Sequence, residues 1–267
     1  MRSDRRPAGP LPVGDRHLRL RLRTPLIVMC GAVLLAACGT SATASRSPAH
    51  PTGARAQSAA ASEPTAPPGS TLLVTLHNDV PSYLTPGGPA SGTVPGSWQG
   101  APSVLPVIAE QPGYLQVRLA QRPNESTAWI RAQGLSYSAT PYRIVVDLAT
   151  THLTLFDKGR QVVTMPAGVG LPQYPTPTGQ FFVALLAMPP SPGYGPFVMV
   201  TSAHSNTITD WDYSGDAIVA IHGPLGASAA IGTTGAQVSH GCVRLQLADQ
   251  EQLRVVPVGT PVDIVSA

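Results

Sequence analysis

The chain has 267 residues, enough for one large domain or two small ones. Only 12% of the residues are charged, and Gly and Pro number 26 and 29. This composition argues against a helix-rich protein and favours short strands joined by many turns. The formal net charge is +3, but seven of the 17 basic and two of the 14 acidic side chains lie in residues 1–38. The remainder is slightly acidic and lacks the basic surface that nucleic-acid binding requires, so we expect no nucleic-acid partner.

Residues 1–37 have the pattern of a secretory signal peptide. Four arginines between Arg16 and Arg23 precede an apolar run from Leu26 to Ala37. This run is shorter than the roughly 20 apolar residues of a permanent transmembrane helix. A basic segment followed by a short apolar core and small residues is the order found in exported proteins. We therefore predict that the protein is exported.

The end of the apolar run, Leu35-Ala36-Ala37-Cys38, resembles the bacterial lipobox, whose cysteine receives a diacylglycerol and becomes the new N-terminus. The resemblance implies a lipidated Cys38, because two acyl chains anchor a protein that one chain would not. The expected location is the outer face of the cytoplasmic membrane, in the cell envelope. An ordinary signal peptide that contains a cysteine is the alternative. Residues 38–70 are rich in Ser, Ala, Thr, Pro and Gly, and we predict a disordered tether there.

Residues 71–138 show short alternating apolar segments separated by Pro and Gly, which predicts a small barrel or sandwich of five or six strands. Three segments of this region resemble an SH3-like module. Either a spacer or a module that binds wall polymer or positions substrate fits this resemblance. The strand candidates are Leu72–Leu76, Val107-Ile108, Tyr114–Leu119 and Ala128–Ile130. The segments that carry the resemblance are Leu105–Ile108, Gly113–Val117 and Arg122–Ile130.

Residues 142–267 also have strand patterns, so the second predicted domain is predominantly β. Asp157-Lys158-Gly159-Arg160 is typical of a hairpin turn, and Ala248–Leu253 predicts a short helix. The predicted strands are Arg143–Leu148, His152–Phe156, Gln161–Met165, Gln180–Leu186, Ala217–Ile221 and Pro261–Val265.

Cys242 is the one cysteine beyond residues 1–38, so it is either a buried inert thiol or a reactive one, and no disulfide is expected. An unassisted thiol has a pKa near 8.5 and is mostly protonated at neutral pH. A nearby imidazole can take its proton, and both His240 and His222 are candidates. If Gly241 and Cys242 form a tight turn, their backbone N–H groups can stabilise the oxyanion of an acyl-transfer intermediate.

The segment Ser239–Cys242, preceded by His222 across sixteen intervening residues, resembles the signature of the L,D-transpeptidase catalytic (YkuD-type) domain. The resemblance spans nearly all of 142–267 and implies a β-sandwich domain with short helices, behind an SH3-like β-barrel of the kind found ahead of some such domains. Supporting segments are Asp147-Leu148, Leu153–Phe156, Lys158-Gly159, Gly168-Val169-Gly170 and Pro175–Phe181.

The resemblance implies that Cys242 is the nucleophile and His222 the general base. Cys242 would attack the carbonyl of the bond between the L-centre and D-centre of a peptidoglycan tetrapeptide stem and expel the terminal D-residue. The amine of a second stem would then resolve the thioester, which gives a 3→3 crosslink. Carbapenem-type β-lactams are implied as covalent inhibitors.

The resemblance also assigns supporting roles near the nucleophile. The backbone N–H groups of His240, Gly241 and Cys242 lie where the family builds its oxyanion site, and Ser239 is expected to support the turn. Some family members have Ser where this chain has Gly223, so here only a backbone carbonyl could orient His222 from that position. Arg244 is a candidate for binding the substrate carboxylate or for supporting the loop.

We expect no cofactor and no metal. Asp210–Asp216 is similar to the start of a calcium loop, but its twelfth position is Ile221 instead of Glu, so we predict a polar loop near the cleft. The histidines and Cys242 contain no compact ligand pair of the kind typical of zinc sites. Two alternatives stay open for the function. These are an L,D-carboxypeptidase, in which water replaces the acceptor amine, and a non-catalytic lipoprotein that binds the cell wall.

Overall fold

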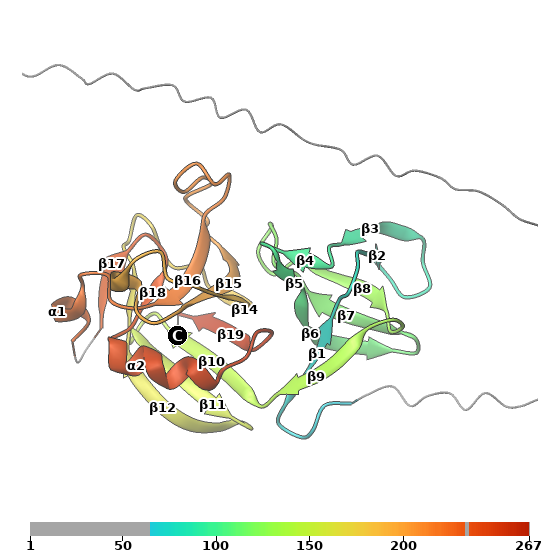
Figure 1. The fold of residues 1–267 in the computed structure, drawn as a ribbon, viewed down its shortest axis with the longest axis horizontal. Helices are drawn as coiled ribbons and strands as arrows, with labels where there is room; N and C mark the ends of the chain where they lie inside the picture. Colours follow the sequence, from blue (N-terminus) through green and yellow to red (C-terminus); the bar gives the residue numbers. More distant parts are fainter. Residues whose placement is uncertain (1–64, 233–234, 267) are drawn as a thin grey trace, which may run out of the picture. The chain divides into compact units, whose positions relative to one another are not determined.

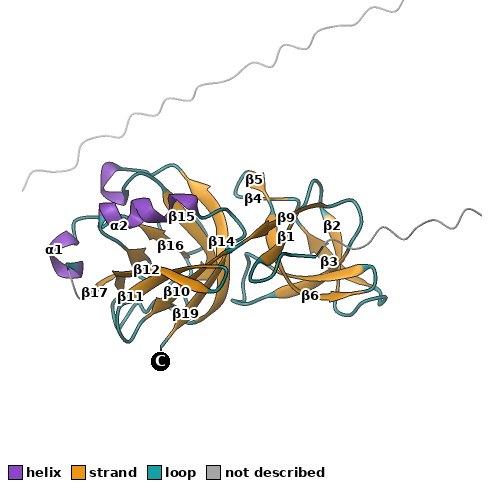
Figure 2. Cartoon of the chain, turned by 90° about the horizontal axis from the view of Figure 1, so that it is seen from below, coloured by secondary structure: helices purple, strands orange, loops and turns teal. Residues whose placement is uncertain are grey.

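The computed structural model describes residues 65–232 and 235–266. The predicted signal peptide, Cys38 and most of the predicted tether lie outside these residues. Strands predominate in the described part and helices are few and short (Figure 2), which confirms the predicted fold class, mainly β with short helices. None of the helices in the described part is long and apolar enough to cross a membrane.

The first sheet has seven strands in the order β3-β2-β8-β7-β6-β1-β9 (Figure 1). Five or six strands were predicted, and β9 extends past the predicted boundary at residue 138. The strands are β1 (Thr71–Thr75), β2 (Val80–Tyr83), β3 (Ala90–Val94), β6 (Val104–Gln111), β7 (Tyr114–Arg118), β8 (Thr127–Arg131) and β9 (Ser136–Thr140), and β4 (Ser97–Trp98) pairs with β5 (Ala101–Pro102) in a separate ribbon.

The core of the first sheet follows from the alternation of side chains along its strands. Leu115 and Val117 of β7 are buried, as is Ile130 of the neighbouring β8. β2 and β3 were not predicted, because Pro81 and Gly92 disfavour strands in isolation. Pairing with β8 and with each other forms them instead.

The second sheet has ten strands in the order β12-β11-β10-β19-β14-β15-β16-β18-β13-β17. Its strands are β10 (Tyr142–Asp147), β11 (His152–Asp157), β12 (Arg160–Pro166), β13 (Gly168–Gly170), β14 (Gly179–Ala187), β15 (Val198–His204), β16 (Ile218–His222), β17 (Ala236–Ser239), β18 (Val243–Arg244) and β19 (Pro261–Val265). The helices are η1 (Pro192–Tyr194), α1 (Ser228–Ile231), α2 (Leu247–Gln252) and η2 (Leu253–Val255).

The predicted hairpin between β11 and β12 is present. Lys158 and Gly159 have φ values of 48° and 76°, as a two-residue turn with left-handed residues requires. The predicted helix is also present as α2, and it continues into η2. Strand β15 and the three short strands β13, β17 and β18 were not predicted, although they bring the site together.

Strand β14 carries the run Phe181-Phe182-Val183-Ala184, whose side chains point alternately to two different cores. Phe181 and Val183 belong to the core of the second sheet. Phe182 and Ala184 belong to the core of the first sheet. A strand covered on both faces has a continuous apolar run instead of an alternating one. The two sheets therefore share a buried surface along β14, and the division into two domains at residues 138–142 stays a prediction.

Candidate active site

Two parallel strands bring the predicted nucleophile and base together. β16 pairs with β18 so that Ile221 lies opposite Val243 and His222 opposite Arg244. Cys242, which directly precedes β18, therefore lies beside Ala220 of β16, two residues before His222. Cys242, His222 and Arg244 line one cleft of about 100 Å³. Ser239 and His240 line the same cleft, so the structure gathers five of the predicted site residues around a common space.

The turn that carries Cys242 is fixed by Ser239. The Ser239 side chain is fully buried, and its hydroxyl donates to the carbonyl oxygen of Cys242 at 2.6 Å. The hydroxyl oxygen of Ser239 also accepts the N–H of Gly241 at 3.0 Å. Gly241 has φ +125°, a value that side chains disfavour. Ser239 and Gly241 therefore shape the turn.

This arrangement reduces the predicted oxyanion donors from three backbone N–H groups to two. The N–H of Gly241 is directed to Ser239 and is not available to a substrate, so Gly241 acts through its conformation. The backbone N–H groups of His240 and Cys242 make no hydrogen bond with any residue of the described part. These two groups remain as candidate oxyanion donors.

Thr176 links the turn that carries Cys242 to a distant part of the sheet, a role that the sequence did not reveal. Its buried hydroxyl accepts the N–H of Gly170 and donates to the carbonyl of Gly241, each at 2.8 Å. Gly170 leaves space for this segment, because a Cβ there would lie 2.3 Å from the carbonyl oxygen of Tyr174. The predicted rigid turn at Pro175–Gly179 thus supports the site through Thr176.

His222 is held in one orientation by the backbone carbonyl of its neighbour. Its ring is 2% exposed, and Nδ1 lies 2.8 Å from the carbonyl oxygen of Gly223. A carbonyl can only accept, so Nδ1 carries the proton and Nε2 has the free lone pair. The ring of Tyr194 packs at 4.6 Å from that of His222, and the N–H of Gly223 donates to the Tyr194 carbonyl at 2.8 Å. Gly223 can therefore orient the imidazole in the way its position suggested.

The environment of the cleft favours the neutral forms of the His222 imidazole and the Cys242 thiol. Burial lowers the pKa of His222 to about 4, aided by the charge of Arg244 and opposed by the Gly223 carbonyl. Burial also raises the pKa of the Cys242 thiol, although the backbone of Ala220 and the charge of Arg244 act in the opposite direction. At neutral pH the resting site thus pairs a thiol with an unprotonated imidazole, and a proton transfer must accompany attack.

The other histidine candidate, His240, has a different environment. Its side chain is exposed, and its ring lies between Tyr174 at 4.7 Å and Trp211 at 5.1 Å. No neighbouring acceptor fixes its tautomer among the described residues. His222 is therefore better placed than His240 to act as a base, because its free nitrogen is defined.

Arg244 supplies the positive charge of the cleft. The residue is half-buried, and its Nε is buried with no hydrogen-bond partner among the described residues. An unpaired guanidinium group beside a nucleophile is suited to a carboxylate, which it can bind through two hydrogen bonds.

The loop predicted to lie near the cleft does so, because Trp211 lines it. Tyr194 and Trp211 were not singled out from the sequence, since an isolated aromatic residue in a loop gives no functional signal. In residues 65–232 and 235–266, no group of three or more His, Cys, Asp or Glu side chains is arranged to hold a metal ion.

Comparisons with known proteins agree on one family. Residues 141–264 match the family model described as the L,D-transpeptidase catalytic domain (YkuD), which covers β10 to β18 and nearly all of β19. Two proteins named putative L,D-transpeptidase YkuD, from Bacillus licheniformis and Bacillus subtilis, are 35% and 33% identical to this chain over 125 residues. Each alignment covers 46% of this chain and 66% of the relative, just under two thirds of its length.

Solved structures of low similarity include an L,D-transpeptidase from Mycobacterium smegmatis, with 20% identity and a TM-score of 0.38 over 61% of this chain and 90% of that one. A structure of LD transpeptidase LdtMt1 in complex with imipenem has 20% identity and a TM-score of 0.40 over 73% and 82% of the two chains.

Proposed function

We propose, from the match of residues 141–264 to the L,D-transpeptidase catalytic domain, that this protein crosslinks peptidoglycan through a thioester on Cys242. The substrate would be a tetrapeptide stem, and the product a 3→3 crosslink. The observation that carries the proposal is the cleft shared by Cys242, His222 and Arg244. A nucleophile, an oriented base and a free cation are the groups that acyl transfer from a peptide with a carboxylate needs.

The first half-reaction forms the thioester. The sulfur of Cys242 attacks the carbonyl carbon of the bond between the L-centre and the D-centre, while Nε2 of His222 takes the thiol proton. The N–H groups of His240 and Cys242 stabilise the oxyanion. When the carbon–nitrogen bond breaks, the imidazolium returns the proton to the leaving amine of the terminal D-residue. Arg244 holds a carboxylate of the donor stem.

The second half-reaction releases the enzyme. An amine of the acceptor stem attacks the thioester, and His222 takes a proton from that amine. The carbon–sulfur bond breaks, a new amide forms, and the proton goes to the sulfur of Cys242. If water attacks instead, the product is a shortened stem and the enzyme is an L,D-carboxypeptidase. Mass spectrometry of the products with and without an acceptor stem distinguishes these outcomes.

Reaction with a carbapenem tests the nucleophile directly. The strained β-lactam carbonyl should acylate Cys242, so intact-mass spectrometry of the full chain should show one adduct with the mass of the drug. Cys242→Ala should show none. Thr178→Val is a matched control, because Thr178 is exposed and makes no hydrogen bond with another described residue. An equal adduct on Cys242→Ala would refute the assignment, and the absence of any adduct on the wild type would favour a non-catalytic wall-binding protein.

We also propose that the protein is exported and anchored at the outer face of the cytoplasmic membrane through a lipidated Cys38. The support is the sequence pattern of residues 1–38 alone. Labelling of producing cells with a radioactive fatty acid should mark the wild-type protein and not Cys38→Ala. An unlabelled, fully soluble wild-type protein in the exported fraction would instead favour an ordinary signal peptide.

A further inference from the structure

The segment between β15 and β16, residues 205–217, forms one wall of the cleft and is named here the wall loop. Ser205, Ile208, Trp211 and Ala217 of this loop line the cleft together with Cys242. The base of the loop is closed by a hydrogen bond from the N–H of Ser205 to the carbonyl of Ala217 at 2.8 Å. This hydrogen bond keeps the two arms of the wall loop together at its base.

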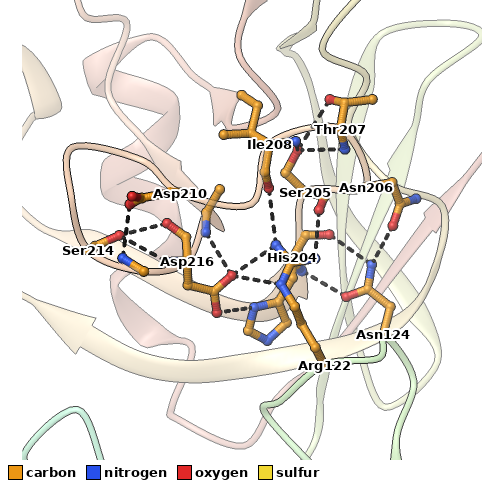
Figure 3. Close-up of polar contacts among 12 residues, drawn as sticks. Arg122, Asn124, His204, Ser205, Asn206, Thr207, Ile208, Asp210, Ser214 and Asp216 are labelled. Carbon is orange, nitrogen blue, oxygen red and sulfur yellow. Dashed lines mark hydrogen bonds and ion pairs between the residues drawn. The ribbon is translucent and has the colours of Figure 1, made fainter.

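Arg122 reaches both arms of the wall loop from the segment between β7 and β8 of the first sheet (Figure 3). On one arm its guanidinium donates to the carbonyl oxygens of Ser205 at 2.9 Å and Ile208 at 3.1 Å. On the other arm Nε donates to Oδ1 of Asp216 at 2.9 Å. Three different nitrogens of the planar guanidinium make these bonds in fixed directions, whereas the three donors of a lysine all lie on one nitrogen and cannot span the same acceptors.

Asn124 holds the start of the same loop. Its amide nitrogen donates to the carbonyl of His204 at 2.8 Å, and its amide oxygen accepts the N–H of His204 at 2.8 Å. The same nitrogen lies 3.1 Å from Oδ1 of Asn206. The amide of Asn124 therefore bonds both the N–H and the carbonyl of His204, the last residue of β15, as a neighbouring strand would.

His204 and Asp216 complete this cluster beneath the loop. The His204 ring is 2% exposed, and its Nδ1 lies 2.8 Å from Oδ2 of Asp216 (Figure 3). Asp216 thus stands between Arg122 and His204, and its Oδ1 also accepts the N–H of Ala217 at 2.7 Å. The carboxylate of Asp216 contacts Arg122, His204 and the N–H of Ala217. Through Asp216, Arg122 therefore also fixes the second arm of the wall loop.

We propose that Arg122 and Asn124 are positioning residues of the active site, which hold the wall loop so that Trp211 contacts the donor stem peptide. Trp211 is 50% exposed and packs at 5.1 Å from the ring of His240. Trp211 therefore contacts His240, lines the cleft and keeps half of its surface exposed. The proposal rests on the proposed function, and it gives the first sheet a part in substrate binding instead of a role as a spacer.

Kinetics of the full chain test this role. Arg122→Ala and Asn124→Ala should raise KM for a tetrapeptide donor by about tenfold with less than about threefold change in kcat, because binding contacts are lost and the reacting groups are not touched. Arg122→Lys should behave as Arg122→Ala. Alkylation of Cys242 by iodoacetamide, which needs no wall loop, should keep its wild-type rate in all three variants.

Glu125→Ala is the matched control. Glu125 lies in the same segment, but its carboxylate accepts the N–H of Gln180 on β14 at 2.9 Å and makes no contact with the wall loop among the described residues. Its KM should stay within about twofold of wild type, since the wall contacts persist. If Glu125→Ala raised KM as much as Arg122→Ala, attachment of the two sheets would be the cause and the positioning role would be refuted.

Fluorescence tests the same role without any substrate. The chain has three tryptophans, so Trp98→Phe with Trp129→Phe leaves Trp211 as the single reporter. In that background Arg122→Ala should lower the anisotropy of Trp211 and increase its quenching by acrylamide, while Glu125→Ala should leave both unchanged. Unchanged fluorescence in folded Arg122→Ala would overturn the positioning role. If the wild-type protein did not react with stem peptides while Arg122→Ala still changed the fluorescence of Trp211, the proposed function would be refuted and the hold of Arg122 on the wall loop would stand.

Discussion

Replacing Thr176 by valine should both destabilise the protein and slow the reaction at Cys242. The valine side chain has nearly the same shape as threonine. It lacks the hydroxyl that accepts the N–H of Gly170 and donates to the carbonyl of Gly241. Both backbone groups are buried, so water does not replace the lost partner. Each unsatisfied group costs about 1–3 kcal/mol, which gives a loss of about 2–6 kcal/mol in the free energy of unfolding.

A chain of this size loses about 2–4 °C in Tm for each kcal/mol. The smaller cost therefore predicts a fall of at least about 4 °C by calorimetry. The carbapenem acylation rate should also fall, because the Gly241 carbonyl belongs to the turn that carries Cys242. Thr176→Ser keeps the hydroxyl and should restore both properties, while Thr178→Val should change neither. A Tm of Thr176→Val within 1 °C of wild type, roughly the effect of a neutral surface change, would refute this reasoning.

Two further predictions concern His222. Because burial lowers its pKa to about 4, the base form is present above that pH, and the carbapenem acylation rate should fall as the pH drops through about 4. A fall centred near the ordinary histidine value of about 6.5 would contradict the neutral resting pair. Gly223→Ser should lower Tm and slow acylation, because a Cβ there would lie 2.9 Å from backbone atoms of Tyr194 and Gly195. Thr178→Val at an exposed position is the control, and equal effects in both variants would contradict the argument.

Local signals in the sequence were sufficient for much of the fold. The hairpin at Lys158-Gly159 was predictable, because left-handed residues between two alternating segments specify a tight turn. Strand β15 was missed although it is apolar, since Val198–His204 follows a segment rich in Pro and Gly and ends in polar residues. Strands β13 and β18 have three and two residues, too few for any periodicity to show. They exist because long-range pairing supplies their hydrogen bonds.

For the candidate site too, the sequence indicated some residues, and only the fold shows how they come together. A family resemblance singled out Cys242 and His222 as candidates. Their proximity comes from the parallel pairing of β16 with β18, which no local pattern encodes. Thr176 lies 65 positions from its partner Gly241, and a threonine in a Pro-rich turn looks like any other turn residue.

The contact between Arg122 and Asp216 spans 94 positions and joins two regions that the sequence presents as separate domains. An arginine in a polar loop of the first sheet gives no sign that it supports a cleft in the second. Its role becomes visible only when both arms of the wall loop are found on one guanidinium group. Three acceptors on the wall loop depend on the single side chain of Arg122. Replacing Arg122 should therefore disturb the position of the wall loop more than a change in the wider contact along β14 would.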